Sequence, residues 1–106
     1  MKALVLLLLL ASGSALGQDP RYCGPPKRDA KGVIVRSSAV LRAFQAENPC
    51  PATHATTGSC PGWIKDHVRP LASCGCDSVD NLQWLPIEMW RAKSLWERKV
   101  YICKAL

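Results

Sequence analysis

Six cysteines are the feature that most constrains how this 106-residue chain can fold, and all six follow a leader-like N-terminus. Lys2 precedes an unbroken apolar run, Ala3–Ala11, and the small residues before position 18 suit a signal-peptide cleavage site. The run is too short for the roughly 20 residues that a membrane-spanning helix needs. We therefore expect residues 1–17 to be a signal peptide and the mature protein to be secreted or periplasmic.

Export determines how the cysteines are interpreted, because disulfides persist in oxidising compartments. An even count of six favours bridging. The alternative is a structural zinc site, which normally has two C-x-x-C pairs. The chain contains only one C-x-C and one C-x9-C spacing, so disulfides are favoured over zinc.

Six cysteines allow 15 pairings, and the sequence does not choose among all of them. Cys50 and Cys60 flank a turn-rich loop and are expected to pair with each other. Cys74 and Cys76 are separated only by a glycine, so each is expected to bridge to another part of the chain. Cys23 and Cys103 lie near the two ends and are candidates to fix the termini.

The size and charge of the mature chain narrow the function classes. About 89 residues form one domain, which excludes multi-domain enzymes, dinucleotide-binding folds and membrane transporters. The mature part carries 13 Lys and Arg residues against 8 acidic ones, a charge of about +5. This excess is consistent with a polyanionic partner, since phosphate contacts supply much of the affinity for nucleic acid. A small secreted protein can also be basic for reasons unrelated to catalysis.

The first half of the mature chain is expected to hold one helix. Residues 18–35 are rich in proline, glycine and charge, and predict an irregular arm that ends in a short strand at residues 32–35. Ser37 or Ser38 is placed to cap a helix that runs to Glu47, and Asn48-Pro49 would end it.

The second half predicts two short strands and a closing helix. Trp63–His67 is one strand, and residues 81–85 are a second strand or an ordered bend. Pro86 suits the first turn of the helix, and Glu88/Arg91 and Lys93/Glu97 can pair on its surface. Apolar residues at steps of three and four predict one buried stripe: Leu85, Met89, Ala92, Trp96, Val100 and Cys103.

Three polar residues stand out as candidates for chemistry. Asp66 and His67 are adjacent on the first strand, so their side chains should leave opposite faces and do different jobs. A carboxylate suits a hard divalent cation, and an imidazole suits proton abstraction near neutral pH. Asn81, fourteen residues after His67, could brace the returning loop through its amide.

Together these residues resemble the HNH endonuclease family, most closely its small members from bacteria and phages. The pattern is Asp66-His67-x-x-Pro70-Leu71, a turn with glycine and cysteine, Asn81-Leu82-Gln83 and a basic helix. Residues 46–51 and 60–63 also look like the lead-in of those members, so the likeness covers about residues 36–99. It implies an α+β fold: a ββα-metal core in residues 36–106, here with an extra N-terminal helix and disulfides.

The resemblance also implies roles. His67 would be the general base that activates water, Asp66 a metal ligand, and Asn81 the residue that holds the loop bearing the histidine. The cofactor would be a divalent metal, with Mg2+ favoured and Mn2+ or Zn2+ open. Trp90 stands where members commonly carry a third ligand, and Glu88 could supply an oxygen instead. The cations expected to bind nucleic acid are Lys65, Arg69, Arg91 and Lys93.

The sequence therefore predicts an exported, metal-dependent HNH endonuclease with DNA as the favoured partner, RNA left open, and little sequence preference. Two alternatives stay open: a disulfide-rich binding or inhibitor protein without catalysis, and a degenerate HNH fold that binds DNA without cutting it. Trp90 could stack on a base, although an aromatic residue covering the small core is the simpler interpretation.

Overall fold

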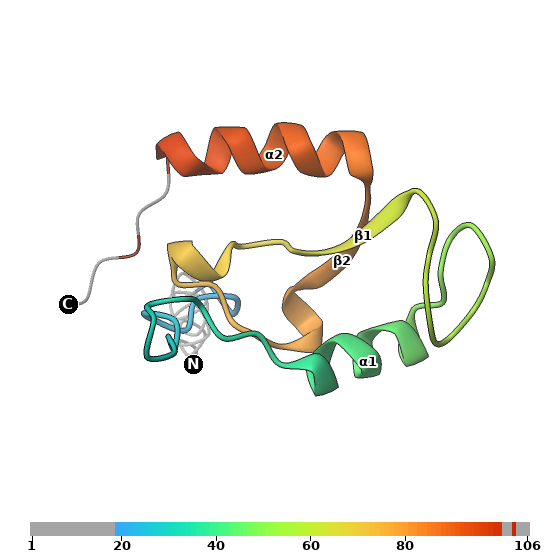
Figure 1. Ribbon diagram of the computed structural model, residues 1–106, viewed down its shortest axis with the longest axis horizontal. Helices are drawn as coiled ribbons and strands as arrows, with labels where there is room; N and C mark the ends of the chain where they lie inside the picture. Colours follow the sequence, from blue (N-terminus) through green and yellow to red (C-terminus); the bar gives the residue numbers. More distant parts are fainter. Residues whose placement is uncertain (1–18, 101–102, 104–106) are drawn as a thin grey trace, which may run out of the picture.

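The computed structural model describes residues 19–100 and 103, so the predicted signal peptide lies outside the described residues (Figure 1). The chain forms a small α+β fold with two helices, a two-stranded hairpin and two short 3-10 turns. In chain order these are α1 (Ser38–Glu47), β1 (Trp63–His67), η2 (Leu71–Ser73), η3 (Val79–Asn81), β2 (Leu82–Pro86) and α2 (Ile87–Val100). Among the described helices, none is both long and apolar enough to span a bilayer.

The centre of the fold is the antiparallel hairpin of β1 and β2, which lies between α2 and α1 in Figure 1. The register pairs Trp63 with Pro86 and His67 with Leu82, which confirms the second strand. Pro86 ends β2 and does not open the helix, contrary to the prediction, because it pairs in the hairpin and α2 begins one residue later. A proline is tolerated at such a strand end, where no ladder hydrogen bond is required of it.

Helix α1 begins and ends as its sequence predicts. The Ser37 hydroxyl accepts a hydrogen bond from the Val40 N–H at 3.2 Å, which satisfies one of the free N–H groups of the first turn. Phe44 is buried, and its ring centroid lies 5.6 Å from that of Trp84 on β2. This contact fixes α1 against the hairpin.

Three disulfides hold the fold together, and no free cysteine is left. Cys50 pairs with Cys60, as predicted, while Cys74 and Cys76 bridge to the two ends of the described chain through Cys103 and Cys23. The zinc alternative therefore has no thiolate to use. The buried apolar core is small and rich in these sulfurs: it consists of Phe44, Cys50, Leu71, Cys74, Cys76 and Leu82.

Two predicted elements are corrected by the structure. The expected strand at residues 32–35 is only an isolated bridge between Arg28 and Ile34. The expected apolar stripe of α2 does not face inward, since Met89 and Trp96 are 58% and 54% exposed. The helix turns its other side to the hairpin because Lys93 pairs there with the buried Asp66.

Candidate active site

A cleft of about 470 Å³ opens between β1, the η2 loop and α2. We call it the β1–α2 cleft. It brings together residues from four separate parts of the sequence. The polar, charged and aromatic side chains in its lining are Arg36, Lys65, Asp66, His67, Ser73, Trp90, Ser94 and Glu97. Both residues of the predicted Asp-His pair thus line one cavity, although they engage different partners.

His67 is paired with a carboxylate that the sequence did not single out. Its Nε2 lies 3.0 Å from Oδ1 of Asp77, and its side chain is 10% exposed. An ionised carboxylate only accepts hydrogen bonds, so in the neutral imidazole this contact assigns the proton to Nε2 and leaves Nδ1 as the basic nitrogen. Nδ1 makes no hydrogen bond within the described part of the chain. The arrangement is that of a base held in one tautomer by an acid.

Asp77 is itself held in place from the far side. Its Oδ2 accepts a hydrogen bond from the Ser37 N–H at 2.7 Å, at the start of α1. Its neighbour Cys76 is bridged to Cys23 in the N-terminal arm. The sequence contains one signal for this pairing: an acidic residue lies ten positions after the histidine, directly after a cysteine.

Asp66 faces α2 and is part of a buried charge cluster. Its Oδ2 accepts a hydrogen bond from the Gln83 amide at 3.0 Å and lies 3.0 Å from Nζ of Lys93. The same ammonium lies 2.6 Å from the Glu97 carboxylate and donates to the His67 carbonyl oxygen at 2.9 Å. Lys93 is therefore an internal cation between two acids and does not point to solvent as a nucleic-acid contact would.

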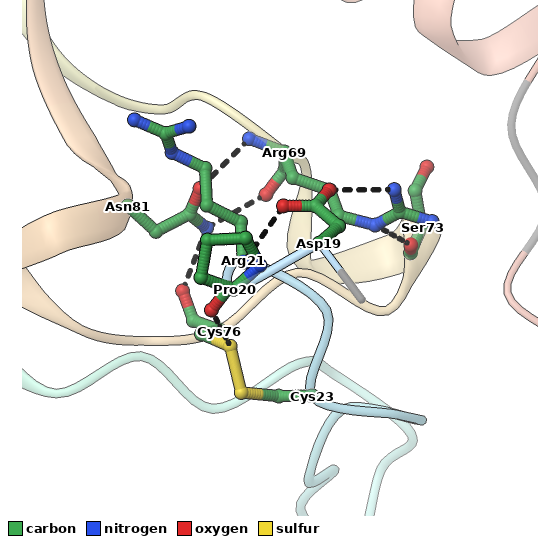
Figure 2. A network of polar contacts seen from close by, with 8 residues as sticks. All are labelled: Asp19, Pro20, Arg21, Cys23, Arg69, Ser73, Cys76 and Asn81. Carbon is green, nitrogen blue, oxygen red and sulfur yellow. Dashed lines mark hydrogen bonds and ion pairs between the residues drawn. A yellow bond between two sulfur atoms is a disulfide. The ribbon is translucent and has the colours of Figure 1, made fainter. Parts of the chain in front are cut away.

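Asn81 is fully buried and clamps the loop that follows His67, as Figure 2 shows. Its Oδ1 accepts from the Arg69 N–H at 2.9 Å, and its Nδ2 donates to the carbonyl oxygens of Arg69 and Cys76 at 2.9 and 2.7 Å. One side chain thus connects the backbone two residues after His67 to the backbone one residue before Asp77. The Asn81 side chain thereby fixes the positions of His67 and Asp77 relative to each other.

Gly75 makes the same loop compact. A Cβ at this position would overlap the Arg69 carbonyl oxygen and would come within 2.8 Å of the Pro70 carbonyl oxygen. The Gly75 N–H donates to that Pro70 oxygen at 2.9 Å. Only glycine allows the backbone of residues 74–76 to approach so closely.

The cations predicted to bind nucleic acid lie in different surroundings. Lys65 lines the cleft, lies over the Trp84 ring at 5.7 Å, and has its pKa lowered by burial. Arg69 is used within the fold: it pairs with Asp19 at 3.3 Å (Figure 2). Its guanidinium also lies over the Tyr22 ring, 5.0 Å from the ring centroid.

Arg91 is outside the cleft, where it pairs with Glu88 at 3.6 Å, as the charge pattern predicted. The same pattern predicted the Lys93–Glu97 pair, which is also observed. The sequence reasoning missed Arg36, which lines the cleft from the segment before α1 and is exposed.

The donor set expected for a metal does not assemble. Glu88 is largely exposed, is paired with Arg91, and does not line the cleft. Asp66 is engaged by Gln83 and Lys93. Within the described ranges, no three His, Cys, Asp or Glu side chains are grouped as metal ligands would be. The residues in this arrangement therefore do not fit the divalent ion that the HNH resemblance implies.

Comparisons with models of known protein families, with curated proteins and with solved structures found no match for this chain.

Proposed function

We propose that this protein is an exported phosphodiester hydrolase of the HNH type that acts on nucleic acid, with DNA as the favoured substrate. The observation that carries the proposal is the His67–Asp77 pair at 3.0 Å, in which His67 lines a cleft that Arg36 and Lys65 also line. The order of β1, β2 and α2 and the motif that contains Asp66, His67 and Asn81 support it further. Three disulfides are consistent with export to an oxidising compartment.

The chemistry follows from the free nitrogen of His67. Nδ1 removes a proton from a water molecule as the water oxygen attacks the phosphorus atom, and the bond from phosphorus to the leaving sugar oxygen breaks. Asp77 stabilises the imidazolium that forms, as the acid of a catalytic triad does. Arg36 and Lys65 bring positive charge to the phosphate oxygens, where charge builds up in the transition state. The leaving oxygen takes a proton from a second water molecule, and the hydroxide left behind takes the proton from the imidazolium, which restores neutral His67.

No step of this proposal passes through a divalent ion, because the described side chains do not form a ligand set for one. In this proposal Asp66 has a structural role. Through Lys93 it holds the carbonyl oxygen of His67, and thereby the end of β1 from which the imidazole projects. Asp66, Lys93 and Asn81 are positioning residues for His67 and are not expected to touch the substrate.

The test is a plasmid-nicking assay with the oxidised, purified mature protein, with Mg2+, with Mn2+ and with EDTA. His67→Ala should abolish nicking, whereas His54→Ala should leave it unchanged. His54 is the matched control because it is the other histidine of the chain and is exposed in the loop closed by Cys50 and Cys60. Equal nicking by His67→Ala and the wild type would contradict the proposal. Retention of DNA without cleavage would favour a fold that binds nucleic acid but does not cut it.

A further inference from the structure

We infer that Trp90 is the stacking platform for an unpaired base of the substrate, so that the β1–α2 cleft takes single-stranded or locally opened nucleic acid in preference to a closed duplex. The inference rests on the proposed function and names the form of nucleic acid that the same site accepts. It starts from the surroundings of this one tryptophan.

Trp90 is half-buried, and it does not belong to the apolar core. The buried core residues cluster around the disulfides and the Phe44 side of the hairpin. Trp90 instead shares its face of α2 with Ser94 and Glu97, at the i, i+4 and i+7 positions that line the cleft. The lining of the cleft therefore combines this large aromatic ring with charged groups on one hand and with Ile64, Pro70, Leu71 and Ala72 on the other.

The other groups in the cleft are suited to the remaining parts of a nucleotide. Arg36 and Lys65 supply positive charge for phosphate oxygens, and His67 supplies the base for hydrolysis. A nucleobase also needs a flat ring on which to stack, and Trp90 is the tryptophan in the lining of the cleft. Stacking on an aromatic side chain requires a base that has left its own stack, which single strands provide at least cost.

The size of the cavity agrees with this assignment. About 470 Å³ lies within the usual range for clefts that bind small ligands, and a nucleotide unit is a ligand of that class. Ser94, one turn after Trp90, has a small side chain, so the space beside the ring is left open. The substrate position follows: the scissile phosphate lies near His67 and the adjoining base lies on Trp90.

The experiment separates binding from cleavage by using His67→Ala as the background. Fluorescence anisotropy measures Kd for a labelled single-stranded oligonucleotide, for the same strand with abasic sites, and for the matching duplex. We expect the single strand to bind about tenfold more tightly than the abasic strand, from the contribution of one stacked base. The duplex should bind more weakly than the single strand. Equal Kd values for the intact and abasic strands would overturn the inference, and no variant at position 90 would be needed to show it.

Variants at position 90 then assign the effect to the ring. Trp90→Leu fills much of the same space without an aromatic face, and should remove the difference between intact and abasic strands. Trp90→Phe should restore part of it. Trp96→Ala is the matched control, because Trp96 lies on the same helix but does not line this cleft. An intact–abasic difference that survives in Trp90→Leu would place stacking elsewhere and overturn the assignment.

The same set distinguishes this inference from the proposed function. With His67 present, Trp90→Leu should raise KM for single strands about tenfold and leave kcat within a few-fold. If His67→Ala still cleaves, the proposed function fails. If His67 is required and Trp90→Leu has unchanged KM, only the stacking inference fails.

Discussion

Nε2 of His67 and Oδ1 of Asp77 lie 3.0 Å apart, although the two residues belong to different elements and only the second is fixed by α1 and the N-terminal arm. The pair converts an ordinary histidine into an oriented base. The loop between His67 and Asp77 is held in one conformation by the buried Asn81, by the close backbone approach at Gly75 and by the disulfide of Cys76. This rigidity keeps the pair in place.

Asp77→Asn should reduce kcat by about 100-fold or more while the protein stays folded, because the imidazole loses the acid that fixes its tautomer. Asparagine keeps an oxygen that can still accept the Ser37 N–H. The measurement is kcat for cleavage of a labelled oligonucleotide, with thermal unfolding as the check on folding. Asp80→Asn, the same substitution at an exposed residue of η3, should have no effect. An unchanged kcat in Asp77→Asn would show that the pair is structural.

Asn81→Ala should lower the free energy of unfolding by about 2–4 kcal/mol, because it leaves one N–H and two carbonyl groups of the loop without partners. Chemical denaturation measures the loss. Asn48→Ala is the comparison: Asn48 is exposed and its amide makes one hydrogen bond, to the Phe44 carbonyl oxygen. Its loss should be about 1 kcal/mol or less. Similar losses in both variants would contradict the clamp assigned to Asn81.

Lys93→Met should be destabilising by about 2–4 kcal/mol, because it leaves the Asp66 and Glu97 carboxylates without their shared cation. The side chains of these two acids are only 7% and 14% exposed, so water screens the loss poorly. Denaturant midpoints at neutral pH give the value. The same substitution at the exposed Lys31 should change the free energy of unfolding by less than about 0.5 kcal/mol. A stable Lys93→Met protein that binds DNA less tightly would instead make Lys93 a substrate contact.

Gly75→Ala should disrupt the loop between His67 and Asp77, because the added methyl group would overlap the Arg69 carbonyl oxygen. We expect a loss of stability of about 3 kcal/mol or more, together with a loss of activity. Gly62→Ala is the contrast, since Gly62 has a positive φ but open space around its Cα. Gly62→Ala should lower the free energy of unfolding by about 1 kcal/mol, from backbone strain alone. Equal stability of the two variants would argue against the tight approach at Gly75.

Replacing Cys23 and Cys76 together by serine should lower both stability and activity. The bond closes 53 residues, and its loss should cost about 4 kcal/mol by chain entropy. Removing the Cys50–Cys60 bond, which closes 10 residues, should cost about 3 kcal/mol. At a temperature where both proteins are folded, only the first should lose activity, because only Cys76 adjoins Asp77. Equal activities would show that the disulfide does not position the acid.

Local signals in the sequence predicted most of the fold. Ser37 caps α1 through its own hydroxyl, and Trp63–His67 forms the predicted strand, which pairs with residues 82–86. The inward face of α2 was not predictable from apolar spacing. That face is set by the charge on Asp66, which draws Lys93 inward and leaves Met89 and Trp96 exposed.

The candidate site was predictable only in part, for a related reason. Asp66, His67 and Asn81 belong to a short motif, so their association is visible along the chain. Arg36 reaches the cleft, and Asp77 reaches His67, only through the tertiary fold. Asp77 meets Ser37, 40 residues away in sequence, and its neighbour Cys76 bonds to Cys23 over 53 residues. No spacing rule predicts pairings over such distances.

For a chain that is exported as predicted, the bridge between Cys23 and Cys76 would also impose an order of maturation. Cys23, a few residues after the predicted signal peptide, is bonded to the neighbour of Asp77. A newly synthesised polypeptide whose thiols are still reduced therefore lacks the covalent hold on that carboxylate. In the proposed hydrolase, the producing cell would be spared damage to its own genome until translocation and oxidation have finished.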